Sequence, residues 1–143
     1  MAYEKFTNLI RVKNTSVLTI PAYSFARLKQ AYSSSLHYFE IEQPDADNLP
    51  LSEVVIVPEE IPPGKVHLAY TSGICIVAKT FGETIVAGDK VGTHANKWTA
   101  TKIDDDSLGN NDGQFLVLDT YGVSNEYLII RPRTRESLFA LLS

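Results

Sequence analysis

Short apolar runs separated by turn-forming residues recur along the whole chain, and this spacing constrains the fold more than any other feature. The runs are rich in valine, isoleucine and aromatic residues, and asparagine, glycine or proline lies in many of the segments between them. Many short runs of this kind indicate β-strands in a sandwich or a barrel. We therefore expect an all-β fold, a β-sandwich or barrel-like domain with long loops. The predicted strands are Leu9–Lys13, Val17–Ile20, Tyr23–Lys29, Leu36–Glu42, Glu53–Val57, Lys65–Tyr70, Ile74–Lys79, Thr84–Val86, Lys90–Gly92, Trp98–Ile103, Phe115–Asp119 and Tyr127–Ile130.

Three segments carry more specific expectations. Ala22–Tyr32 fits both a strand and a helix face, and we favour the strand. Ile74–Lys79 is the most continuously apolar run, which places it at the centre of a sheet. Glu136–Leu142 predicts a short C-terminal helix.

The length of the chain, 143 residues, fits one domain spanning 1–143, with a C-terminal arm over 131–143. No apolar stretch is long enough to span a bilayer, and the N-terminus lacks the apolar core of a signal peptide. We expect a protein made in a reducing cytoplasm that does not bind membranes. A net charge of −4 argues against a protein that coats nucleic acid.

Charge is unevenly distributed along the sequence. Residues 1–39 hold five bases against one acid, whereas residues 40–60 hold seven acids and no base. One interpretation is a set of solvated loops and outward strand faces. The other is that opposite patches meet between copies of the chain and steer assembly.

The residues that usually carry catalysis form no recognisable motif. His37, His67 and His94 have no metal-ligand spacing, and no Gly-x-Ser-x-Gly elbow or phosphate-binding loop is present. We interpret the first two histidines as structural and His94 as solvated. The lone cysteine, Cys75, lies in an apolar run and is expected to be a buried, unreactive thiol. We therefore predict no catalytic residues, no cofactor and no enzyme activity; a small enzyme with dispersed catalytic groups is the rival.

The acidic segment Asp104–Gly113 is the one place where a cation could bind, because calcium prefers clustered carboxylate and carbonyl oxygens. Its order of acids does not follow the EF-hand pattern, so we favour a solvated loop tip and predict no metal site. Seven tyrosines and Trp98 could instead line a glycan- or peptide-binding surface. Core or interface packing is the alternative for these rings.

The C-terminal end is unusual because it is basic and then apolar. Three arginines surround Pro132, and leucines and a phenylalanine follow. An apolar end must pack on its own domain or on a neighbour. Both options stay open. Arginine and aromatic residues are common interface anchors, which points to both terminal arms as interfaces. The candidate interface residues are Tyr3, Phe6, Arg131, Arg133, Arg135, Leu138, Phe139 and Leu142.

Several turn-centred segments resemble those of tailed-bacteriophage virion proteins. Asn14–Tyr23 resembles a segment in which an asparagine and a polar turn precede Ile-Pro-Ala-aromatic. Gly73–Val77, Val86–Val91, with its Ala-Gly-Asp-x-Val pattern, and Leu128–Arg131 resemble parts of head-decoration and related β proteins. The likeness covers about a third of the chain.

The resemblance implies a virion component made in the host bacterial cytoplasm. Its expected function is that of a decoration, or cement, protein that stabilises the head by bridging major capsid subunits. Its expected partners are the major capsid protein or other virion proteins and further copies of itself, as a dimer or trimer. The alternatives are an adaptor associated with a fibre or the tail, and a β module that binds glycans or a receptor.

Overall fold

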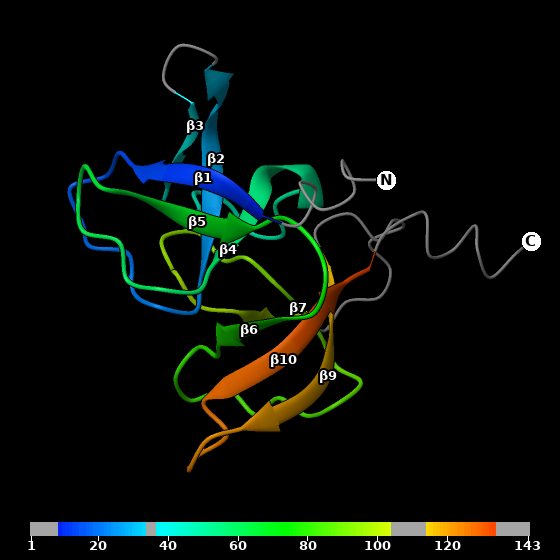
Figure 1. Cartoon of the computed structure of the whole chain (residues 1–143). Coiled ribbons are helices and arrows are strands. Elements are labelled where there is room, and N and C mark those ends of the chain that lie inside the picture. The colour runs from blue at the N-terminus through cyan, green and yellow to red at the C-terminus, as the bar shows by residue number, and fades with distance from the viewer. Residues whose placement is uncertain (1–8, 34–36, 104–113, 134–143) are drawn as a thin grey trace, which may run out of the picture.

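The fold, seen in a computed structural model that describes residues 9–33, 37–103 and 114–133, is all-β, as predicted. It consists of a closed five-stranded barrel and a second five-stranded sheet. In Figure 1 the barrel lies above and the second sheet below. The predicted N-terminal arm, the C-terminal helix and the Asp104–Gly113 loop lie outside the described residues. Of the predicted C-terminal arm, residues 134–143 also lie outside them, whereas Arg131 and Pro132 belong to the strand Tyr127–Pro132.

The barrel has the strand order β1-β3-β2-β4-β5 and closes where β5 pairs with β1. The β1–β3 pair is parallel and the other pairs are antiparallel. A 3-10 turn, η2 (Leu51–Glu53), leads into β4. The barrel strands are β1 (Leu9–Asn14), β2 (Ser24–Ser33), β3 (Tyr38–Glu42), β4 (Val54–Val57) and β5 (Val66–Tyr70).

The second sheet is antiparallel, with the order β6-β10-β9-β7-β8. A bridge between Lys79 and Ala100 joins its two outer ends, because Ala100 N–H donates to Ala78 O and Thr80 N–H donates to Ala100 O. The strands are β6 (Cys75–Ala78), β7 (Lys90–Gly92), β8 (Thr101–Lys102), β9 (Phe115–Tyr121) and β10 (Tyr127–Pro132).

Strand β4 explains how the two parts pack together, because all four of its residues are buried. Val55 and Val57 point into the barrel, where they pack with residues such as Val12 and Ile41. Val54 and Ile56 point the other way and pack against β6, β9 and β10. A strand covered on both faces reads as a continuous apolar run, as Val54–Val57 does in the sequence.

Phe25 on β2 belongs to the same inter-sheet core as Val54 and Ile56. Its ring centroid lies 4.9 Å from that of Phe115 on β9. Contacts of this kind are worth about 0.5–1.5 kcal/mol beyond the area they bury. The outer side of β2 and β4 is therefore covered by the second sheet.

Three predicted strands are wrong or shorter than expected. Val17–Ile20 is a loop in which only Ile20 bridges another segment, and Thr84–Val86 forms no strand. Trp98–Ile103 shrinks to the two residues of β8. The predicted central position of Ile74–Lys79 is also wrong, since β6 is an outer strand of its sheet. Cys75 and Val77 of β6 are buried because Phe25, Val54 and Ile56 of the barrel pack on them.

The loop after β1 is fixed by the fully buried side chain of Asn14. The amide nitrogen donates to the carbonyls of Leu18 at 2.7 Å and Ile61 at 2.8 Å. The amide oxygen accepts from the N–H of Ser16 at 2.9 Å and from its hydroxyl at 2.7 Å. These local bonds replace a strand ladder, which is why the apolar residues Val17 and Leu18 project into solvent.

In the part of the chain that the structure describes, no helix is long and apolar enough to cross a membrane.

Candidate interaction surfaces

The ionisable residues of the described chain form no group of three or more that could hold a metal ion. His67 Nε2 lies 3.2 Å from a carboxylate oxygen of Glu59, and His94 Nδ1 lies 3.6 Å from one of Asp47. His37 is exposed and precedes β3. His37, which the sequence placed within the predicted strand Leu36–Glu42, is therefore a turn residue instead.

Cys75 is buried, as predicted, with 6% of its surface exposed. Burial raises the pKa of its thiol from 9.0 to about 11. The group is protonated at neutral pH, and a protonated thiol is a poor nucleophile and a poor metal ligand.

The guanidinium of Arg27 on β2 lies close to three carboxylates from the acid-rich residues 40–60 of its own chain. Its Nη1 lies 2.7 Å from Glu42, and its Nε lies 3.4 Å from Asp45 and 3.6 Å from Glu53. The buried Nε makes no hydrogen bond, so the last two pairs are charge contacts only. Part of the charge asymmetry in the sequence is thus neutralised inside the fold. Those carboxylates are less available for contacts between copies.

The outer face of β1 and β5 is apolar and basic. Val66, Leu68 and Tyr70 alternate along β5 with exposed fractions of 36%, 42% and 38%. The register places Lys13 opposite Val66 and Arg11 opposite Leu68, on the same face of the barrel. We call these five residues the β1–β5 face. The second sheet covers the outward residues of β4 but not this face, so apolar side chains stay exposed here.

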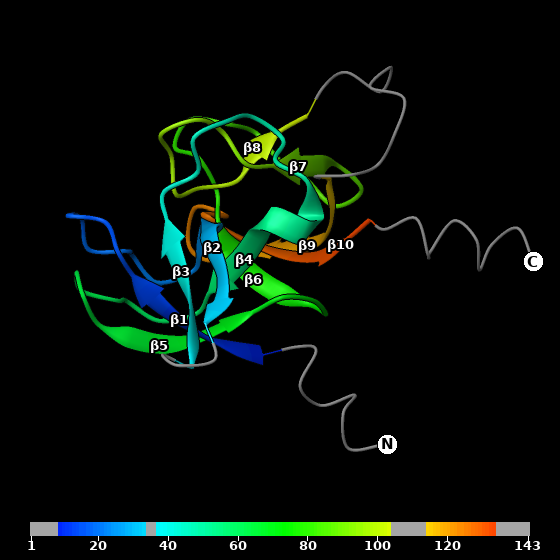
Figure 2. The ribbon, with the colours of Figure 1, turned by 90° about the horizontal axis from the view of Figure 1, so that it is seen from above.

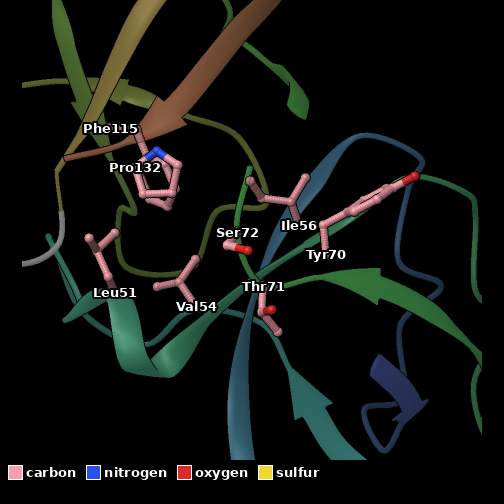
Figure 3. A pocket seen from close by; sticks show the side chains of 8 residues that line it. All are labelled: Leu51, Val54, Ile56, Tyr70, Thr71, Ser72, Phe115 and Pro132. Atoms are coloured by element: carbon pink, nitrogen blue, oxygen red, sulfur yellow. The ribbon is translucent and has the colours of Figure 1, made fainter. Parts of the chain in front are cut away.

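An apolar pocket lies at the seam between the barrel and the second sheet, next to the end of this face. It has a volume of about 70 Å³. Figure 3 shows Leu51 and Val54 on one side, Phe115 and Pro132 on another, and Tyr70 at the far end with its hydroxyl pointing away. We call it the seam pocket; its lining residues are Leu51, Val54, Ile56, Tyr70, Thr71, Ser72, Phe115 and Pro132.

A second hollow, of about 190 Å³, shares Ile56 and Tyr70 with the seam pocket and adds Tyr23 and Ile74. Tyr23 leads from this hollow to a cluster of rings. The Tyr127 ring lies 5.3 Å from Tyr23, edge to face, and 5.3 Å from Tyr121, stacked. Tyr121 is 39% exposed, so the cluster opens to solvent.

The groups around Tyr121 influence one another. Partial desolvation raises the pKa of Tyr121, and the neighbouring Tyr23, Tyr127 and Glu126 add to the rise. The pKa of Glu126 is lowered, first because the N–H of Ser124 donates to its carboxylate at 2.8 Å. Glu126 is therefore ionised at neutral pH, beside the exposed rings.

Trp98 does not belong to this cluster. It is half-buried and packs against the barrel core, and its carbonyl accepts from Phe25 N–H. Trp98, a candidate for glycan binding in the sequence, thus packs as part of the barrel.

The structure places only two of the eight candidate interface residues. Arg131, on β10, is exposed. Arg133 is half-buried, and its Nη1 donates to Gln114 Oε1 at 3.0 Å. The other six lie outside the described residues: Tyr3, Phe6, Arg135, Leu138, Phe139 and Leu142. The sequence does not predict the β1–β5 face or the seam pocket, because segments far apart in the chain come together to form them. Alternation within Val66–Tyr70 is the one local signal of the face.

No protein-family model and no curated protein matches the sequence. The fold is shared with a solved structure, the crystal structure of the head fiber gp8.5 N base in bacteriophage phi29. The TM-score is 0.59 and the sequence identity 16%, and the match covers 89% of this chain and 93% of that chain. The resemblance to phage virion proteins seen in the sequence is thus confirmed at the level of the fold.

Proposed function

We propose that this chain is a non-enzymatic structural protein of a phage head, which binds the capsid surface and bridges major capsid subunits as a decoration protein. The observation that carries the proposal is the fold, shared along nearly the whole chain with the base of a head fiber. That neighbour favours a position on the head over one on the tail. The protein would then be made in the host cytoplasm and incorporated into the virion.

The β1–β5 face supports a binding role and suggests the chemistry of its partner. Its three apolar side chains are aligned on one strand, and Arg11 and Lys13 lie beside them on the next. Aligned apolar side chains with basic neighbours suit a partner surface with an apolar centre and carboxylates at its rim. If the protein buries this face only on the assembled shell, its binding shifts the equilibrium toward the assembled shell and so stabilises it.

Head binding can be measured with expanded empty heads assembled from the major capsid protein of the genome that encodes this chain. We expect the purified chain to sediment with the heads and to raise their melting temperature. Leu68→Glu should weaken binding at least tenfold because it places a charge in the apolar row. Val123→Glu is the matched control, since Val123 is fully exposed on the β9–β10 turn. If the unmodified chain neither binds the heads nor changes their melting temperature, the proposal is wrong.

A second candidate function, glycan binding, is favoured by the tyrosine cluster. Tyr121 offers a partly exposed ring, and the ionised Glu126 lies close enough to shift its pKa. Aromatic rings with a polar group at the edge suit the apolar face and the hydroxyls of a sugar. This activity would belong to an adhesive module rather than to a cement protein.

A glycan array separates the two candidates. Glycan binding predicts hits that Tyr121→Ala abolishes and that Leu68→Glu leaves unchanged. Retained head binding with no hit on the array would remove the second candidate.

A further inference from the structure

The seam pocket lies at the point where the described chain ends. Strand β10 ends at Pro132, and this residue is itself part of the pocket wall. The next residue, Arg133, is held to Gln114 by two hydrogen bonds, N–H to carbonyl at 2.9 Å and Nη1 to Oε1 at 3.0 Å. These bonds fix the last described residues at the rim of the pocket.

The sequence that follows matches the pocket in chemistry. Residues 134–143 include Leu138, Phe139, Leu141 and Leu142, a spacing that places four apolar side chains on one face of a helical turn. The pocket offers apolar walls from Leu51 and Val54 among others. An apolar chain end stabilises the protein only if some apolar surface covers it.

We propose that the C-terminal segment 136–142 docks in the seam pocket of its own chain. Phe139 or a neighbouring leucine inserts as the anchor, and the remaining apolar side chains cover the rim. The segment thereby ties β10 of the second sheet to η2 and β4 of the barrel. The inference does not depend on the proposed head-binding function.

Reach and volume favour this occupant over a second copy or another protein. The six residues that follow Arg133, as far as Phe139, span about 20 Å when extended, so Phe139 can return to a pocket that Pro132 itself lines. A short connection raises the effective concentration of the segment to the millimolar range, above that of any separate chain. A pocket of about 70 Å³ suits one anchoring side chain rather than a whole strand.

Disulfide trapping in the full-length chain tests the proposal. Cys75→Ser removes the native thiol, Ser52→Cys places a thiol on an exposed position beside Leu51, and Ala140→Cys places one within the segment. A disulfide needs Cα atoms within about 7 Å, so it reports docking directly. We expect mild oxidation to give a monomer with an internal cross-link. Ser124→Cys with Ala140→Cys is the matched control; Ser124 is exposed on the β9–β10 turn and should not cross-link.

The outcomes are distinct. No cross-link, a cross-link equal in both pairs, or a cross-link only between two chains would overturn docking within one chain. A second measurement does not depend on cysteines: Leu138→Ser with Phe139→Ser, in the full chain, should shift the methyl NMR signals of Val54 and Ile56. The signals of Val12 and Ile41, inside the barrel, should stay in place. Unchanged signals for Val54 and Ile56 would likewise overturn the proposal.

Discussion

Asn14 donates a 2.8 Å hydrogen bond to the carbonyl of Ile61, joining segments 47 residues apart inside the barrel end. Asn14→Ala would remove one donor from each of the carbonyls of Leu18 and Ile61, which still accept from Ser16 Oγ and Ile20 N–H, and would leave the N–H of Ser16 without its acceptor. Lost hydrogen bonds of this kind cost about 1–3 kcal/mol, so we expect the free energy of unfolding to fall by about 2–3 kcal/mol in urea titrations. Ser16→Ala should cost about 1 kcal/mol, because Asn14 keeps its two carbonyl partners. Equal losses in the two variants would contradict this assignment.

The ion pair between Arg27 and Glu42 should be stronger than the contact between His67 and Glu59. Both side chains of the first pair are mostly buried, with 26% and 30% exposed, whereas those of the second are 37% and 69% exposed. A double-mutant cycle with Arg27→Met and Glu42→Gln should give a coupling energy of about 1–2 kcal/mol. The cycle with His67→Ala and Glu59→Gln should give less than about 1 kcal/mol. A larger coupling energy for His67 with Glu59 than for Arg27 with Glu42 would contradict this prediction.

Cys75 should react slowly until the protein unfolds. With the pKa raised from 9.0 to about 11, the thiolate fraction at pH 8 falls about a hundredfold between the unfolded and folded states. Kinetics with a thiol reagent, with and without urea, should show at least that difference. The folded state favours the protonated thiol. The contribution of Cys75 to the free energy of unfolding is therefore fully present below pH 9 and is lost as the pH rises through 11. Fast reaction in the native state would contradict the burial of this thiol.

Gly122→Ala should destabilise the β9–β10 turn more than Gly82→Ala destabilises its own turn. Both glycines have positive φ, +101° and +88°, which costs any other residue about 1 kcal/mol. A Cβ at Gly122 would also displace the Glu126 carboxylate and break the bond it accepts from Ser124 N–H, whereas a Cβ at Gly82 meets no atom within 4 Å. We expect losses of about 2 and about 1 kcal/mol in thermal unfolding. The pKa of Glu126, followed by NMR, should rise only in the first variant.

The sequence predicts where the strands lie better than it predicts which strands pair with one another. Alternation located β3 and β5, and a continuous apolar run located β4, because side-chain burial leaves a local pattern. Val17–Ile20 had the composition of a strand, but the Asn14 side chain holds it as a loop. The seam pocket could not be foreseen, since Leu51, Phe115 and Pro132 meet only after both sheets have formed.

The barrel order β1-β3-β2-β4-β5 has a consequence for how the molecule comes into being. Leu9 pairs with Tyr70, so the first described strand has its antiparallel partner only after some sixty further residues have been made. Its other neighbour, β3, lies parallel to it and cannot be reached by a tight hairpin. We therefore expect closure of the barrel to be a slow step of folding, on about the millisecond-to-second scale of non-local β topologies. On the ribosome, the edge of β1 that pairs with β5 would stay exposed until β5 emerges.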